Sequence, residues 1–244
     1  ITTPDACDLD LKPTDGNVRD LTINHASCVA TWTADTTLSR NLTITAGEFK
    51  AQGGATLEVA GATSVTGTLT CFSGAVSLGS GITNAFAVVV NSGGTFNGGT
   101  GTHTYGSLNV HSSAALYAFS AGTTTLNGKS SGLQIFGTSA TDKITAAGTL
   151  TIDTAQSPVV INCADTTGIN NLTVNSGTGR IVRLGNDLTV NGTLTVSAGT
   201  VDTDSSNNYD LTVTGDCVVT GTLTLNDSTV AVGALRAVSG AAIT

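Results

Sequence analysis

The chain has 244 residues and a formal net charge of −8, and only 11% of its residues are charged against 39% that are hydrophobic. A mean hydropathy of +0.22 with regularly placed Val, Leu and Ile argues against disorder, and no apolar run reaches the roughly 18 residues of a transmembrane helix. We therefore expect no membrane insertion, and because no cluster of Lys or Arg occurs, we expect no nucleic-acid partner.

Residues 1–40 are predicted to form an N-terminal cap or attachment segment. They are the least repetitive part of the chain and contain two of its three prolines. The first turn of a stack of β-coils exposes an unpaired edge and an open core, so a covering segment is expected there. The chain starts at Ile1 and lacks methionine, which indicates either a processed terminus or the start of a fragment.

The five cysteines fall into two groups. Cys7 and Cys28 lie in the N-terminal segment and are candidates for a disulfide bond. The other three occupy alternating apolar stretches, and free cysteines of that kind pack as small hydrophobic side chains. We therefore expect buried thiols at Cys71, Cys163 and Cys217.

Residues 41–230 are predicted to form the main body of the molecule, a parallel β-helix (β-solenoid) with coils of about 22 residues. A tripeptide of aliphatic residue, threonine and aliphatic residue recurs there, and in a strand its two aliphatics face the core while the threonine faces solvent. Leu150, Leu172 and Leu194 are spaced 22 residues apart and should stack in one interior column. Helical periodicity is missing, so almost no helix is expected.

An all-β alternative is an antiparallel β-sandwich. Asn191-Gly192 lies between two alternating strands, and this dipeptide also fits the tight turn of a β-hairpin. The solenoid is favoured because the recurrence of about 22 residues persists along the chain.

The stretch 59–128 contains no charged residue and holds six of the ten aromatic residues. The cores of obligate interfaces are depleted in charge and enriched in aromatics. The stretch is therefore predicted to be the contact surface of a homo-oligomer, with its outer faces hydrated by Ser, Thr and Asn as the alternative. The candidate interface anchors are Phe86, Phe96, Tyr105, Tyr117 and Phe119.

The segment 201–210 is a candidate calcium site, since Asp202, Asp204 and Asp210 offer the oxygen ligands that calcium prefers. It lacks the glycine and the terminal glutamate of an EF-hand loop, so a plain hydrated loop is favoured over a calcium site. No other cofactor is expected.

Residues 231–244 are small and apolar with a single charge, which predicts a terminal rung or a junction onto another domain or chain. Catalysis on polysaccharides needs paired carboxylates. The only glutamates are Glu48 and Glu58, and we expect both to be solvated surface residues and the chain not to be an enzyme.

The glycine corners of residues 191–196 and 220–225, with sequences Asn-Gly-Thr-Leu-Thr-Val and Thr-Gly-Thr-Leu-Thr-Leu, resemble the β-helical shafts of phage virion proteins. These include tail fibres, tailspikes and head decoration proteins, and there is a weaker similarity to bacterial haemagglutinin-like adhesins. The resemblance covers about residues 40–230. It implies a structural role, a trimer, contacts with other virion or surface proteins, and a place on a virion or an extracellular surface.

Three functional hypotheses follow. The first is a rigid structural component of a phage virion, and the second is a cell-surface adhesin that binds a host glycan or protein. The third is an ice-binding protein, because rows of threonine on a flat solenoid face order water in some such proteins. The Thr-x-Thr pairs that would build these rows recur at uneven intervals, at residues 68/70, 149/151, 193/195 and 222/224.

Overall fold

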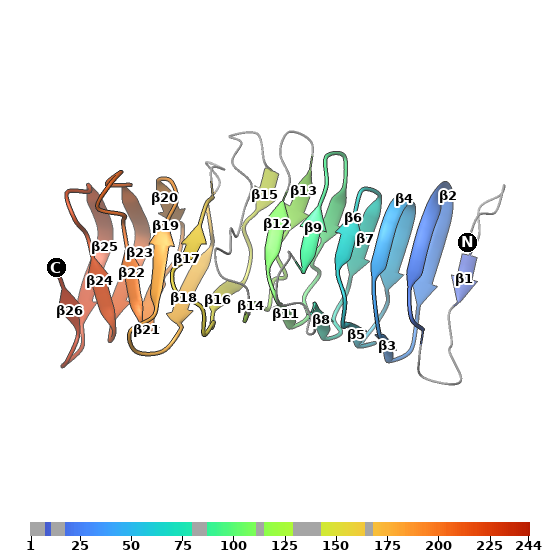
Figure 1. The fold of residues 1–244 in the computed structure, drawn as a ribbon, viewed down its shortest axis with the longest axis horizontal. Coiled ribbons are helices and arrows are strands. Elements are labelled where there is room, and N and C mark those ends of the chain that lie inside the picture. The colour runs from blue at the N-terminus through green and yellow to red at the C-terminus, as the bar shows by residue number, and fades with distance from the viewer. Residues whose placement is uncertain (1–7, 11–17, 80–86, 111–114, 129–142, 164–167) are drawn as a thin grey trace.

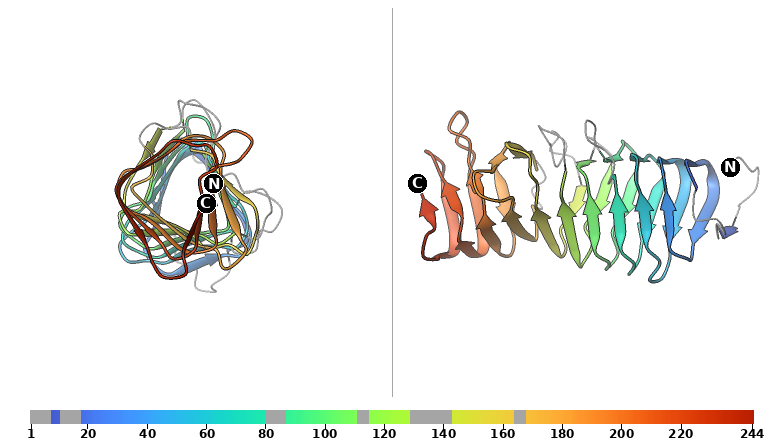
Figure 2. Two further views of the ribbon diagram at one scale, coloured as in Figure 1. Left: turned by 90° about the vertical axis from the view of Figure 1, so that its left-hand side faces the viewer. Right: turned by 60° about the horizontal axis from the view of Figure 1, so that its bottom comes forward.

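The computed structural model describes residues 8–10, 18–79, 87–110, 115–128, 143–163 and 168–244. These residues form a β-solenoid of about nine turns with coils of about 21 residues, and they contain no helix. The coils stack along one long axis and have a roughly triangular outline (Figures 1 and 2). All pairs between the described strands are parallel. The predicted parallel β-helix is therefore confirmed, and the antiparallel sandwich is wrong.

The strands belong to three sheets. The ten-stranded sheet contains β1 (Asp8–Asp10), β2 (Leu21–Trp32), β4 (Leu42–Ala51), β6 (Thr63–Val65), β7 (Thr68–Cys71), β9 (Val88–Val90), β10 (Thr95–Asn97), β12 (Leu108–Val110), β13 (Leu116–Ala118) and β15 (Lys143–Thr145). The eleven-stranded sheet contains β3 (Thr36–Leu38), β5 (Leu57–Val59), β8 (Val76–Leu78), β11 (His103–Tyr105), β14 (Thr123–Leu126), β16 (Thr149–Ile152), β18 (Asn171–Asn175), β20 (Leu188–Val190), β21 (Leu194–Ala198), β23 (Leu211–Val219) and β25 (Val230–Ala237). The five-stranded sheet contains β17 (Val159–Ile161), β19 (Ile181–Leu184), β22 (Thr200–Asp202), β24 (Thr222–Thr224) and β26 (Ala242–Ile243).

The core consists of side-chain columns that run along the solenoid axis. Leu150 pairs with Leu172, and Leu172 pairs with Leu194, so the predicted interior column is confirmed. All three leucines are buried, whereas Thr173 beside Leu172 is half-buried on the outside. The alternation of the tripeptide thus places each aliphatic residue above its counterpart one coil earlier.

The regular coils begin earlier in the chain than the sequence predicted. Strand β2 pairs along its length with β4, so Leu21 lies beside Leu42, and Trp32 is buried and packs against Phe49 at a ring-centroid distance of 5.7 Å. The boundary at residue 41 is therefore wrong, because the tripeptide at Leu21 already forms a coil. Residues 1–7 and 11–17 of the predicted cap lie outside the described residues.

At the other end, β25 and β26 pair with β23 and β24 and form the last described coil. Leu235 continues the column of Leu194 and Cys217, yet it is 49% exposed because no further described coil covers it.

One corner of the solenoid requires glycine because neighbouring coils approach closely there. A side chain at Gly101 would collide with the carbonyl oxygen of Gly74, and the Cβ of a side chain at Gly122 would lie 2.6 Å from the carbonyl oxygen of Gly101. The coil spacing at this corner is consequently set by backbone against backbone.

Replacing Gly101 by alanine is expected to lower the free energy of unfolding by about 1 to 3 kcal/mol, because the added methyl group must push two hydrogen-bonded coils apart. Gly54→Ala is the matched control, since a Cβ at Gly54 would have no neighbouring atom within 4 Å. Urea unfolding followed by far-UV circular dichroism measures both variants. Equal stabilities of the two would contradict the close approach at the corner.

Candidate binding face

A row of five threonines occupies the outward-facing centre of five consecutive strands, β11, β14, β16, β18 and β21. Each threonine pairs directly with the next one in the register of the parallel ladder. Neighbouring strands lie about 4.8 Å apart, so the side chains repeat at that distance along the solenoid axis. The members of this first row are Thr104, Thr125, Thr151, Thr173 and Thr195.

A second row lies two residues earlier on the same strands, where side chains again point outward. Thr123 pairs with Thr149, and Thr149 with Asn171. The backbone N–H of Thr193 donates a hydrogen bond of 2.9 Å to the Asn171 side-chain oxygen, which continues the row into the next coil. The two rows are separated by about 6.6 Å, the rise of two strand residues. We call the nine residues of both rows the threonine face.

The hydroxyl groups of the first row are available to a ligand. All five threonines are half-buried, and in the described part of the chain none of their hydroxyl groups has an intramolecular hydrogen bond. The first row is also uncharged. The nearest charged residues in the same outward column are Glu58 and Arg236, which lie two coils beyond the two ends of the row. The five strands that carry the first row lie along the lower edge of the solenoid in Figure 1, and Figure 2 (right) brings that side forward.

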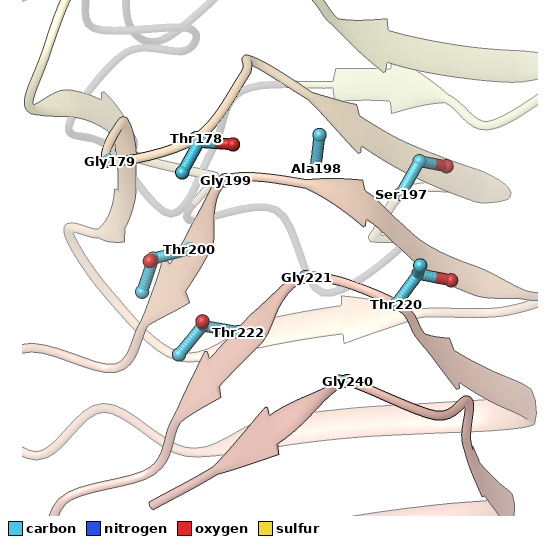
Figure 3. Close-up of a pocket in the computed structure, with 10 residues that line it drawn as sticks. All are labelled: Thr178, Gly179, Ser197, Ala198, Gly199, Thr200, Thr220, Gly221, Thr222 and Gly240. Carbon is cyan, nitrogen blue, oxygen red and sulfur yellow. The ribbon is translucent and has the colours of Figure 1, made fainter.

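A shallow hollow lies at the corner where the threonine face meets the five-stranded sheet (Figure 3). Thr200 of β22 pairs with Thr222 of β24 along its floor. Its lining contains hydroxyl groups and bare glycine backbone but no ionisable side chain, so it can hydrogen-bond a neutral molecule and offers no acid, base or metal ligand. The lining residues are Thr178, Gly179, Ser197, Ala198, Gly199, Thr200, Thr220, Gly221, Thr222 and Gly240.

The three aspartates of the candidate calcium site do not converge. Asp202 forms an ion pair with Arg183 at 3.2 Å, Asp204 accepts a hydrogen bond from the Ser206 backbone N–H, and Asp210 accepts one from the Thr229 backbone N–H. The hydrogen bonds from the Ser206 backbone N–H and the Asn207 side chain hold the pKa of Asp204 below its usual value. No group of three potential ligands that could hold a metal occurs among the described residues. These contacts favour the hydrated loop over the calcium site, because each carboxylate has a partner within its own loop or on an adjacent coil.

The predicted interface anchors point into the solenoid. Phe96, Tyr105, Tyr117 and Phe119 are almost completely buried, and Phe96 stacks on Tyr117 at a centroid distance of 5.1 Å. These four residues are not surface anchors, because each one takes an inward position of its coil. Phe86 lies outside the described residues.

The same interior cluster holds a buried histidine. His103 is fully buried, its Nδ1 faces the hydroxyl group of Tyr105, and its Nε2 has no hydrogen-bond partner within the described structure. Burial lowers the pKa of His103 from 6.5 to about 4, so the imidazole is neutral in the folded protein at pH 7.

Neither glutamate has a carboxylate partner. Glu48 of β4 contacts Lys50 at 3.2 Å and accepts a hydrogen bond from Thr70, whereas Glu58 of β5, in a different sheet, accepts one from Thr37. Each of the two carboxylates is thus engaged by side chains of its own sheet.

The cysteines divide as expected for the described residues. Cys71, Cys163 and Cys217 are buried thiols, as predicted, and burial raises the pKa of the Cys71 thiol to about 12. Cys28 is bonded in a disulfide. Cys7 lies outside the described residues.

Comparisons with known proteins identify no relative, because no protein-family model, no curated protein and no solved structure matches this chain. Among the described residues, no helix has the length and apolar character to cross a membrane.

Sequence reasoning missed the threonine face because it searched for a constant interval. The five threonines of the first row are 21, 26, 22 and 22 residues apart, so loops of different length separate strands that lie in register. Two predicted pairs, Thr149/Thr151 and Thr193/Thr195, belong to the face, while Thr68/Thr70 and Thr222/Thr224 lie in other sheets. Aligning the sequence by its tripeptides would have found the row.

Proposed function

We propose that this chain is a structural component of a phage virion, a head decoration, fibre or spike protein, displayed on the virion or another extracellular surface. The observation that carries the proposal is the unbroken ladder of parallel pairs from β3 to β25. A stack of coils held by this ladder and by a continuous apolar core resists bending, and it keeps its two ends at a fixed distance. Such a body suits a shaft or a clamp.

The chemistry of the described residues favours a role that depends on shape. The two glutamates lie in different sheets, and the corner hollow has no ionisable lining residue. Retaining and inverting glycosidases place two carboxyl groups about 5 to 9 Å apart across the scissile bond. We therefore expect the protein to release no sugars from capsular or cell-wall polysaccharides.

Self-association through the uncharged stretch remains part of the proposal, with different contact residues. Phe72 and Leu116 are the large hydrophobic side chains of this stretch that are exposed in the described structure, at 40% and 42%. Exposed apolar side chains favour association. We propose that copies of the chain, as a trimer, meet there and contact other virion or surface proteins, with a host glycan as a further partner.

Immunogold electron microscopy tests the proposed role. An antibody raised against the purified chain is applied to phage particles and to cell envelopes from the same source culture, with pre-immune serum as the control. Labelling of particles at regular positions is the expected result, and native mass spectrometry of the purified protein should give a trimer mass. Labelling of cell envelopes in the absence of particle labelling would overturn the virion role and support an adhesin.

A further inference from the structure

The threonine face is a regular two-dimensional array. Its first row spans five strands, or about 19 Å along the axis, with a repeat of about 4.8 Å, and its second row lies about 6.6 Å away. The backbone ladder fixes both distances before any ligand arrives. Threonine is also stiff at χ1. Binding to this array therefore costs little conformational entropy.

The chemistry of the array suits a neutral ligand that repeats with a similar period. Each threonine of the first row presents a hydroxyl group with no intramolecular partner and a methyl group beside it. Charged side chains hold their own hydration shells, and the first row contains none. The face can thus order a layer of water across five coils.

Soluble glycans fit this surface less well. Sites for small molecules are concave and combine apolar or aromatic walls with a few polar groups. The threonine face has no aromatic side chain, and the hollow at its corner is shallow and lined by threonine, serine, alanine and glycine. A flat lattice of water oxygens, whose repeats are comparable with those of the array, matches the face better.

We propose that the threonine face, where Thr104, Thr125, Thr151, Thr173 and Thr195 align on consecutive coils, binds the surface of ice. The hydroxyl groups take the place of water molecules in the outer layer of the crystal, while the methyl groups exclude liquid water between them. This proposal does not rest on the structural role proposed above, because the threonine face depends only on the pairing of the solenoid strands and not on attachment to a virion.

Partition into growing ice tests the proposal. The purified chain is mixed with a labelled protein that does not bind ice, and the fraction of each that is captured on a slowly growing ice surface is measured. The wild-type chain should be enriched in the ice, and Thr151→Lys at the centre of the row should fall to the level of the marker protein. Recrystallisation of ice grains should slow with the wild-type chain and not with the variant.

Thr212→Lys is the matched control. Thr212 is the central residue of a second Leu-Thr-Val tripeptide, like Thr173. It pairs with Thr189 and lies exposed outside the threonine face. This variant should be captured like the wild-type chain. Circular dichroism verifies that each variant is folded, and Thr173→Lys replaces Thr151→Lys if the latter does not fold.

Three results would overturn the proposal. The first is a wild-type chain that is excluded from ice like the marker, a measurement that needs no variant. The second is equal capture of the face and control variants. The third is binding of the wild-type chain to crystalline cellulose or chitin with none to ice, which would assign the face to a polysaccharide.

Discussion

Replacing Leu172 by alanine is expected to lower the free energy of unfolding by about 2 to 5 kcal/mol. Leu172 is 1% exposed and lies between Leu150 and Leu194 in the interior column. The substitution removes apolar contacts and leaves a cavity, and the coils on either side cannot close it because the hydrogen-bond ladder fixes their spacing. Urea unfolding monitored by circular dichroism measures the loss.

Thr173→Ala is the control for this prediction. Thr173 is the next residue of the same strand, but its side chain faces outward and is half-buried. We expect a change within about 1 kcal/mol, which is the range of strand propensities. If both variants lost the same stability, the assignment of inner and outer faces would be contradicted.

Acidification is expected to destabilise the protein through His103. Its pKa is about 4 in the folded protein against 6.5 ordinarily, so the unfolded chain binds a proton more readily. Above about pH 6.5, His103 is neutral in both the folded and the unfolded chain, and the free energy of unfolding is at its full value. As the pH falls from 6.5 towards 4, the unfolded chain takes up the proton first and the free energy of unfolding decreases. The loss reaches about 3 kcal/mol, because each pKa unit corresponds to 1.36 kcal/mol.

His103→Leu separates this effect from the titration of carboxylates. The leucine fills the interior column between Val76 and Thr124 without an ionisable group. Urea unfolding at pH 7, 5.5 and 4 should show a smaller decrease in stability for the variant than for the wild-type chain. Parallel decreases in both proteins would mean that His103 is not the group responsible.

The solenoid itself could be predicted because its signal is local and repeated. Leu150, Leu172 and Leu194 stand in the same tripeptide context at a constant interval, and the parallel ladder places them in one column. The solenoid starts at Leu21, inside the segment 1–40 that was assigned to the cap for its low repetitiveness and its two prolines, because the tripeptide at Leu21 carries the same signal as the later ones. Matching short patterns was more reliable there than composition.

The aromatic residues were misassigned for a different reason. The lack of charged residues in the stretch 59–128 concerns the outward positions of its strands and says nothing of where the aromatic side chains point. Phe96 stands between Thr95 and Asn97 in an alternating strand, and its position faces the core. Composition could not separate these cases, but the alternation could. For Asp210, no sequence signal distinguishes a metal ligand from an acceptor for a backbone N–H on the next coil.

The in-register pairing of the coils also determines how the molecule comes apart. Every pairing between described strands joins a coil to the one before or after it, so a central coil is held on both sides and an end coil on one. Unfolding therefore starts at the ends and moves inward. In the 244-residue chain, we expect the amide protons of β14 and β16 to exchange with solvent more slowly than those of β25, and the folded rod to shorten in steps of one coil.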